Sequence, residues 1–201
     1  MGITKNDAEI NLNLLDNELK NELNEVAERR LVVINPIQLN IVNFDDYELT
    51  KTINLPNFPN ISIVTPDRQM NLTKAVYIEK SSFKEHDEKG FYGLALGKTI
   101  RLKYSVFLEY VNYNKETNIV DVKIVNPEIN FKKVKGILNW VGDDSINATL
   151  NIFDGLKCEN KTILVEPSLV NSKMGDRFQF ERHGYFYTVN NLIFNQLVTS
   201  K

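Results

Sequence analysis

The feature that most constrains this chain is a change in its hydrophobic period near residue 29. Over residues 11–27, apolar side chains recur at helical spacing with Glu and Asn between them. Those apolar positions are Leu15, Leu19, Leu23 and Val26. From residue 30 onward the period is two, in short segments rich in Val, Ile, Leu and Thr. The sequence therefore predicts one N-terminal helix followed by a chain that is mainly β.

The strand-like segments recur at a spacing of roughly ten residues. They lie at residues 30–36, 38–44, 48–55, 74–80, 99–113, 118–125, 131–141, 148–154, 162–166, 177–189 and 191–200. A stretch rich in Pro and Asn, residues 56–73, is predicted to be a long loop. We find no second helical pattern and no internal sequence repeat. Many short strands in this arrangement favour an antiparallel β-barrel or a pair of barrels.

Composition excludes several classes of protein. No apolar run approaches the ~18 residues of a transmembrane helix, and the first residues lack the pattern of a signal peptide. We therefore expect a cytoplasmic protein without a membrane partner. The single cysteine, Cys158, excludes an internal disulfide and a multi-cysteine zinc site. His86 and His183 show no triad or metal spacing, so we interpret Cys158 and both histidines as structural or incidental.

The charge is unevenly distributed along the chain. The net charge of −2 argues by itself against a nucleic-acid partner, because phosphate binding usually leaves a basic footprint. Residues 1–28, however, hold seven acidic and two basic residues, a net of −5, so the remainder carries +3. A local basic face on the remainder is therefore compatible with the composition.

The most specific segment is residues 166–186, EPSLVNSKMGDRFQFERHGYF. It resembles a C-terminal signature of the glutaminyl-tRNA synthetases, in which a Glu-Pro-Ser-Leu turn precedes a Phe-Gln-Phe-Glu-Arg-x-Gly-Tyr-Phe strand. Three more segments are similar to family motifs and follow in the family's order. They are LPNFPN at 55–60, ALGKTIRLKY at 95–104 and KVKGILNWV at 133–141. The resemblance covers nearly the whole chain.

The resemblance implies a fold of two antiparallel β-barrels preceded by the N-terminal helix. Residues 1–28 would end the helical region that contacts the tRNA stem. The proximal barrel, built from both ends of the chain, would comprise residues 29–90 and 165–201. The distal barrel, inserted between them, would comprise residues 91–164. Within the last strand motif, Trp140 is expected in the core.

The resemblance also implies the partner and the missing chemistry. The expected partners are tRNA-Gln, rather than DNA, and the catalytic domain of the same full-length enzyme. ATP and glutamine would bind that domain. Neither the His-Ile-Gly-His nor the Lys-Met-Ser-Lys type of motif occurs in this sequence, and there is no glycine-rich phosphate loop. We therefore expect no cofactor in this chain and no aminoacylation by it alone.

Three residues align with family positions that contact the middle anticodon base: Arg29, Gln179 and Arg182. Their chemistry suits a splayed base, because a Gln amide offers a donor and an acceptor to a uracil edge and Arg offers a fork of donors. On an ideal strand Gln179 and Arg182 would point to opposite faces. The end of the strand or a bulge near Gly184 has to bring them together.

Weaker matches complete the predicted site. Arg101 aligns with an arginine near the first anticodon base and Lys103 with a neighbouring basic position. Asn60 matches a loop asparagine that approaches the anticodon loop. Thr4 and Lys5 match a pair that approaches the tRNA backbone. Each of these residues also has an ordinary interpretation as a solvated or turn residue.

The segment GFYGLALG, residues 90–97, departs from the family pattern. Where the family carries a Lys-Arg pair whose arginine reads the third anticodon base, this chain has Tyr92 and Gly93. Either Tyr92 stacks on that base, or backbone groups read it, or the specificity differs. This departure leaves two alternatives open, the anticodon-binding region of a glutamyl-tRNA synthetase and a β-barrel that serves as a protein-interaction module. A cluster of the predicted residues in one groove would favour RNA.

Overall fold

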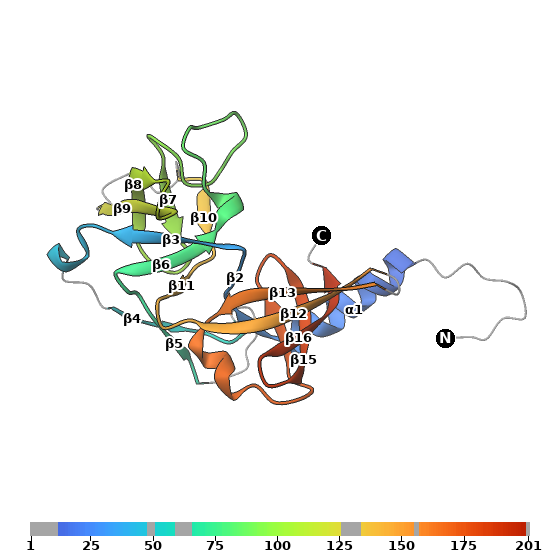
Figure 1. The fold of residues 1–201 in the computed structure, drawn as a ribbon. Helices are drawn as coiled ribbons and strands as arrows, with labels where there is room; N and C mark the ends of the chain where they lie inside the picture. The colour runs from blue at the N-terminus through green and yellow to red at the C-terminus, as the bar shows by residue number, and fades with distance from the viewer. Residues whose placement is uncertain (1–11, 48–50, 59–65, 126–133, 155–156, 200–201) are drawn as a thin grey trace, which may run out of the picture.

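The computed structural model describes residues 12–47, 51–58, 66–125, 134–154 and 157–199 (Figure 1). The chain is mainly β, as predicted, and within those residues α1 (Leu12–Val26) is the single α-helix. Leu23 of α1 packs with Tyr185 and Val198, which lie near the other end of the chain. None of the described helices has the length and apolar character needed to cross a membrane.

One seven-stranded sheet is built from both ends of the chain and forms the proximal barrel. Its spatial order is β1-β14-β15-β16-β12-β13-β2. The strands are β1 (Glu28–Arg30), β2 (Val32–Ile34), β12 (Ile146–Asp154), β13 (Lys157–Val165), β14 (Arg177–Phe180), β15 (Gly184–Asn190) and β16 (Ile193–Thr199). The two edge strands, β1 and β2, are halves of one strand interrupted at Leu31. The chain itself therefore links the two edges and closes the sheet.

The second seven-stranded sheet forms the distal barrel, with the order β10-β7-β8-β9-β3-β6-β11. Its strands are β3 (Pro36–Ile41), β6 (Ala75–Glu79), β7 (Thr99–Leu102), β8 (Phe107–Asn114), β9 (Ile119–Val125), β10 (Gly136–Leu138) and β11 (Val141–Gly142). The edges β10 and β11 are again consecutive pieces of one strand, interrupted at Asn139 and Trp140. Figure 1 shows the two barrels side by side, with the distal barrel mostly green and the proximal barrel mostly orange and red.

The strand pairing assigns strands to the two barrels differently from the prediction. The predicted ranges were 29–90 and 165–201 for the proximal barrel and 91–164 for the distal barrel. β3 and β6, expected in the proximal barrel, pair with β9 and β11 of the distal barrel. β12 and β13, expected in the distal barrel, pair with β16 and β2 of the proximal barrel. The described strands of the distal barrel thus fall between residues 36 and 142, and those of the proximal barrel fall within 28–34 and 146–199. Alternation of apolar residues reports the buried face of a strand but not the identity of its neighbour.

Between the barrels lies a two-stranded hairpin of β4 (Thr52–Leu55) and β5 (Arg68–Asn71). The prediction of an uninterrupted loop over 56–73 is wrong, because β5 lies inside that range and pairs with β4 in register. Leu55 and Met70 of the hairpin enter the core of the distal barrel. The described part also contains the 3₁₀ helices η1 (Phe44–Asp46), η2 (Lys80–Ser82) and η4 (Pro167–Asn171).

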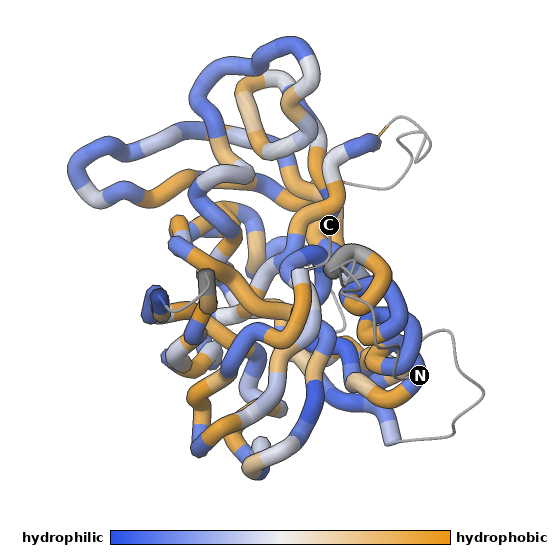
Figure 2. The backbone as a smooth tube through the Cα atoms, turned by 90° about the vertical axis from the view of Figure 1, so that its right-hand side faces the viewer, coloured by the Kyte–Doolittle hydropathy of each residue, from blue (hydrophilic) through white to orange (hydrophobic). Residues whose placement is uncertain are grey.

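Each barrel closes around its own apolar core. Trp140 is fully buried in the distal core, as expected, and its indole Nε1 donates to the Lys103 carbonyl at 2.9 Å. Phe180, Phe186 and Phe194 fill the proximal core. Figure 2 shows the alternation of hydrophobic and hydrophilic residues along the strands that produces these two cores. The polar side chains left on the outer faces are the ones available to a ligand.

Candidate nucleic-acid interface

The parallel pairing of β1 with β14 places two of the predicted residues side by side. Arg29 lies opposite Gln179 in the register of these strands, and both side chains are partly exposed. Arg29 Nη2 donates to Asn24 Oδ1 at 3.1 Å, and Gln179 Nε2 donates to the Tyr185 hydroxyl at 3.1 Å. The Tyr185 hydroxyl donates in turn to Asn24 Oδ1 at 3.3 Å. Two segments distant in sequence, one around residues 24–29 and one around residues 179–185, therefore hold one guanidinium and one amide in place.

Arg182 joins this region through the end of its strand. β14 ends at Phe180, and Arg182 follows in a turn with φ +69°, closed by a 2.9 Å hydrogen bond from His183 N to the Phe180 carbonyl. The left-handed backbone conformation frees Arg182 from strict strand alternation. The sequence analysis predicted that the strand ends or bulges near Gly184, and in the structure β14 ends between Gln179 and Arg182.

Lys103 brings a cation from the distal barrel to the same region. It follows β7 and forms an ion pair with Glu181 of the proximal barrel, which also accepts the Tyr104 hydroxyl at 3.1 Å. Burial, together with the positive charges of Arg182, Arg29 and Arg68, lowers the pKa of Lys103 to about 8. Positive charge is thus concentrated where the barrels meet, which favours an anionic ligand.

Arg101 lies on the outward side of β7, two residues before Lys103. Its neighbour in the parallel β10 strand is Ile137. The Arg101 guanidinium lies over the Phe107 ring, 5.5 Å from the centroid, and its Nε is 3.5 Å from the Ser105 carbonyl. Arg101 is therefore held on the face of the distal barrel and is not part of the Arg29–Gln179 network.

The junction depends on a carboxylate that the sequence analysis did not single out. Glu166 is fully buried and accepts hydrogen bonds from Leu31 N at 2.8 Å and from Arg68 Nε at 2.7 Å. Arg30 Nε lies 3.5 Å from the same carboxylate, and its Nη1 donates to Asn57 Oδ1 at 2.8 Å. Burial lowers the pKa of Arg30, while the Glu166 carboxylate opposes that shift. A buried charge requires such partners.

Glu166 therefore connects three parts of the molecule: the proximal strand β13, the interrupted strand at Leu31 and the β4–β5 hairpin. A signal for this cluster existed in the sequence. Arg29 and Arg30 are consecutive, so one of them must point inward if the segment is a strand, and an inward arginine needs a carboxylate. The position of that carboxylate, 136 residues along the chain from Arg30, could not be predicted from the sequence.

Tyr92 and Gly93 lie in the loop between η2 and β7. Tyr92 is 58% exposed. A Cβ added to Gly93 would lie 2.2 Å from the Ser82 carbonyl oxygen, so the backbone here is too close to η2 for a side chain. The arginine of the family pattern therefore cannot be placed at this position without moving the loop.

Other predicted residues lie outside the described part of the chain: Asn60, Thr4 and Lys5. Among the described residues, no group of three or more His, Cys, Asp or Glu side chains could hold a metal ion. The candidate residues that the structure describes are thus Arg29, Gln179, Arg182 and Lys103 where the barrels meet, with Arg101 and Tyr92 on the distal barrel.

These features define a class of protein: a double β-barrel that presents guanidinium, amide, ammonium and tyrosine groups where its barrels meet. Such groups suit single-stranded RNA. The family models for the anticodon-binding domain of the class I tRNA synthetases (E and Q) match residues 27–126 and 137–189. The chain belongs to this family.

The similar curated proteins are glutamine–tRNA ligases. The ligase of Hamiltonella defensa is 30% identical over 99% of this chain and 42% of its own length. The ligase of Vibrio campbellii is 30% identical over 98% of this chain and 42% of its own length. The cytoplasmic ligase of Arabidopsis thaliana is 30% identical over 99% of this chain and 30% of its own length. The chain thus spans between 30% and 42% of the length of these relatives.

Proposed function

We propose that this chain reads the anticodon loop of tRNA-Gln as the C-terminal part of a glutamine–tRNA ligase. The observation that carries the proposal is the Arg29–Gln179 pair, held on adjacent strands by Asn24 and Tyr185. An unpaired base needs donors and acceptors fixed on a rigid surface, and this pair supplies both. The middle anticodon base, a uracil, would contact this pair.

The neighbouring cations would hold the backbone of the loop. Arg182 and Lys103 lie close enough to each other for the charge of Arg182 to lower the pKa of Lys103. RNA phosphates bound there would relieve this like-charge repulsion and contribute to affinity without reading sequence. Arg101, on β7 of the distal barrel, would contact the first anticodon base.

The remaining activity belongs to a longer protein. Its catalytic part would bind ATP and glutamine in the cytoplasm, and correct docking of the anticodon at the two barrels would favour productive placement of the acceptor end. The names and lengths of the curated relatives support this assignment.

The test is fluorescence anisotropy of this chain with a tRNA-Gln anticodon stem-loop at low salt. Changing the middle base should cost about 1–3 kcal/mol, the value of one base-edge contact. Arg29→Ala should remove most of that discrimination. Lys123→Ala, an exposed cation on the distal strand β9, is the control for loss of one positive charge.

Equal binding of loops with any middle base would contradict base reading at Arg29 and Gln179. Preference for a tRNA-Glu loop would assign the chain to the glutamyl branch of the family. Absence of binding by both this chain and the full-length protein would favour a protein-interaction module.

A further inference from the structure

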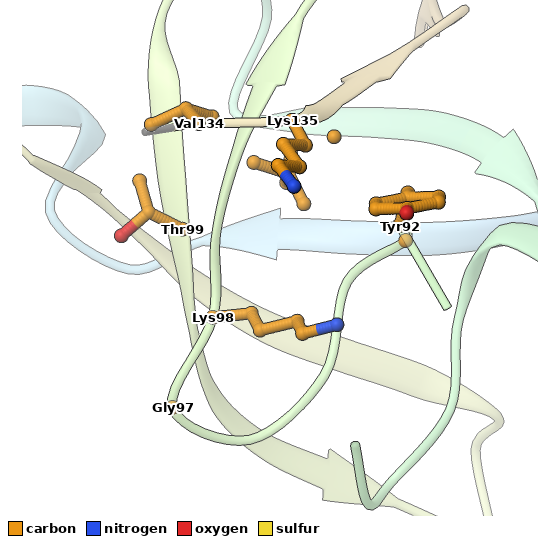
Figure 3. A pocket seen from close by; sticks show the side chains of 9 residues that line it. Tyr92, Gly97, Lys98, Thr99, Val134 and Lys135 are labelled. Atoms are coloured by element: carbon orange, nitrogen blue, oxygen red, sulfur yellow. The ribbon is translucent and has the colours of Figure 1, made fainter. Parts of the chain in front are cut away.

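Tyr92 lines two neighbouring clefts. The first, with a volume of 320 Å³, is lined by Tyr92, Lys98, Thr99, Val134, Lys135 and neighbouring glycines (Figure 3). The second, with a volume of 390 Å³, shares Tyr92 and Lys135 and extends to Arg182. The exposed tyrosine therefore lines both a cleft of the distal barrel and a cleft that reaches Arg182 of the proximal barrel.

The side chains at this tyrosine suit a flat, negatively charged ligand. Lys135 Nζ lies 5.8 Å from the centroid of the Tyr92 ring, and Figure 3 shows both side chains lining the first cleft. Lys98 lies on the other side of that cleft and is ion-paired with Asp87 at 2.5 Å. No carboxylate is found among the described residues that line either cleft. An aromatic face beside lysines is the usual combination for a nucleobase and its phosphate.

Close backbone packing fixes the position of the tyrosine. Leu94 N donates to the Ser82 carbonyl at 2.8 Å, and there is no room for a Cβ at Gly93. On the other side, a Cβ at Gly136 would lie 2.4 Å from the Tyr92 carbonyl oxygen. The two glycines thus allow η2 and β10 to approach the backbone on both sides of Tyr92. A platform held in this way loses little conformational entropy on binding.

We propose that Tyr92 and Lys135 form a base-stacking subsite that accepts one unpaired nucleotide of the RNA loop without reading its identity. The proposal rests on the proposed function, since Arg29, Gln179 and Arg182 would hold the rest of the loop. In the first cleft, the described side chains include no amide, guanidinium or carboxylate that could match one base edge. Stacking tolerates any base because every base has a π-face.

The experiment uses the same anticodon stem-loop with 2-aminopurine placed at each loop position in turn. One position should show quenching on binding to the wild-type chain, and Tyr92→Ala should abolish that quenching. Tyr92→Ala should also weaken binding about 5- to 150-fold, the cost of one lost stack, whereas Tyr92→Phe should bind as the wild type does. Replacing the base at that position with each of the others should change affinity by less than about threefold.

Two controls separate stacking from other effects. Leu96→Ala removes an apolar side chain of similar exposure from the same loop and should leave binding unchanged. Lys135→Ala should reduce the slope of log affinity against log salt by about 0.7, the value for one phosphate contact on a single strand. Lys135→Arg should retain that slope.

The outcomes separate this subsite from the proposed function. If Arg29→Ala abolishes discrimination at one base while Tyr92→Ala changes neither affinity nor quenching, the chain reads RNA and the subsite is absent. If the base stacked on Tyr92 proves as selective as the base at Arg29, the inference of tolerance is overturned. If no loop binds to the wild-type chain or to the full-length protein, both proposals fail.

Discussion

The two barrels of this molecule have the same construction. Starting at the first half of the interrupted strand, the order of neighbouring strands in the proximal barrel is β1-β14-β15-β16-β12-β13-β2. In the distal barrel the order is β10-β7-β8-β9-β3-β6-β11. The pairings also agree in direction, because β1–β14 and β12–β16 are parallel, and so are β10–β7 and β3–β9. The chain is therefore a structural duplication: β1 to β9, without the hairpin of β4 and β5, corresponds element by element to β10 to β16.

The two halves exchange their first strand. β1 and β2, from the first half, complete the barrel of the second half, and β10 and β11 complete the barrel of the first half. Neither barrel can close without a strand from the other half of the chain. Because of this exchange, we expect the two barrels to unfold as one unit, although their cores are separate.

The corresponding positions differ in chemistry. In register, Gln179 corresponds to Arg101, and Arg29 corresponds to Ile137. Arg182 corresponds to Tyr104, and both have a left-handed backbone, with φ of 69° and 64°. The same backbone frame thus presents a polar pair in the proximal barrel and an arginine beside an apolar residue in the distal barrel.

The interlocked construction is most sharply tested at Glu166. Glu166→Ala should destabilise the chain by about 3–5 kcal/mol, because it leaves Arg68 buried without its carboxylate and Arg30 with Glu28 alone. Urea denaturation followed by circular dichroism should show one transition shifted to lower urea. Glu159→Ala, which removes an exposed carboxylate of β13, should change stability by less than about 0.5 kcal/mol. Two separate transitions in the wild type would contradict a single folding unit.

The comparison of corresponding positions is sharpened by Gln179→Ala and Arg101→Ala. Gln179→Ala should reduce discrimination at the middle base by about 1–3 kcal/mol and leave discrimination at the first base intact. Arg101→Ala should have the converse effect. Binding of stem-loops with single-base changes measures both. Identical profiles for the two variants would mean that the barrels do not read separate bases.

Gly93 and Gly97 lie in one loop, and substituting each compares the stability cost of a steric clash with the cost of an unfavourable backbone conformation. Gly93→Ala should cost about 2 kcal/mol, because the added Cβ would collide with the Ser82 carbonyl. Gly97→Ala meets no atom within 4 Å but requires φ of +76°, and should cost about 1 kcal/mol. Thermal unfolding of both variants measures the difference. A harmless Gly93→Arg variant would show that this loop can rearrange to accept the family's arginine.

The smallest expected effect is the pH dependence due to Lys103. Its pKa of about 8 lies below that of an exposed lysine, so Lys103 is charged below pH 8 and progressively neutral above it. A nearby phosphate would raise that pKa, so affinity for the stem-loop should fall by up to about tenfold between pH 7 and pH 9. Lys103→Arg keeps its charge and should bind with little pH dependence over that interval. An unchanged pH profile in this variant would exclude Lys103 as the titrating group.

The sequence by itself determined the local features of this protein. The helical period located α1, and the period of two located most of the strands. Trp140 was expected in the core and is fully buried there. The family motifs brought together Arg29 and Gln179, which are indeed neighbours in register. These features were readable because propensity, periodicity and motif order are properties of contiguous residues.

The tertiary structure alone decided which strands pair and what that pairing brings together. The exchange of β1 and β2 for β10 and β11, the strand β5 within a proline-rich segment, and the carboxylate of Glu166 beside Arg30 all depend on contacts between distant residues. The same is true of Gly93, whose lack of a side chain is explained by the nearby Ser82 carbonyl. A strand's pattern specifies its buried face, whereas its hydrogen-bond partner is chosen by the closure of the whole barrel.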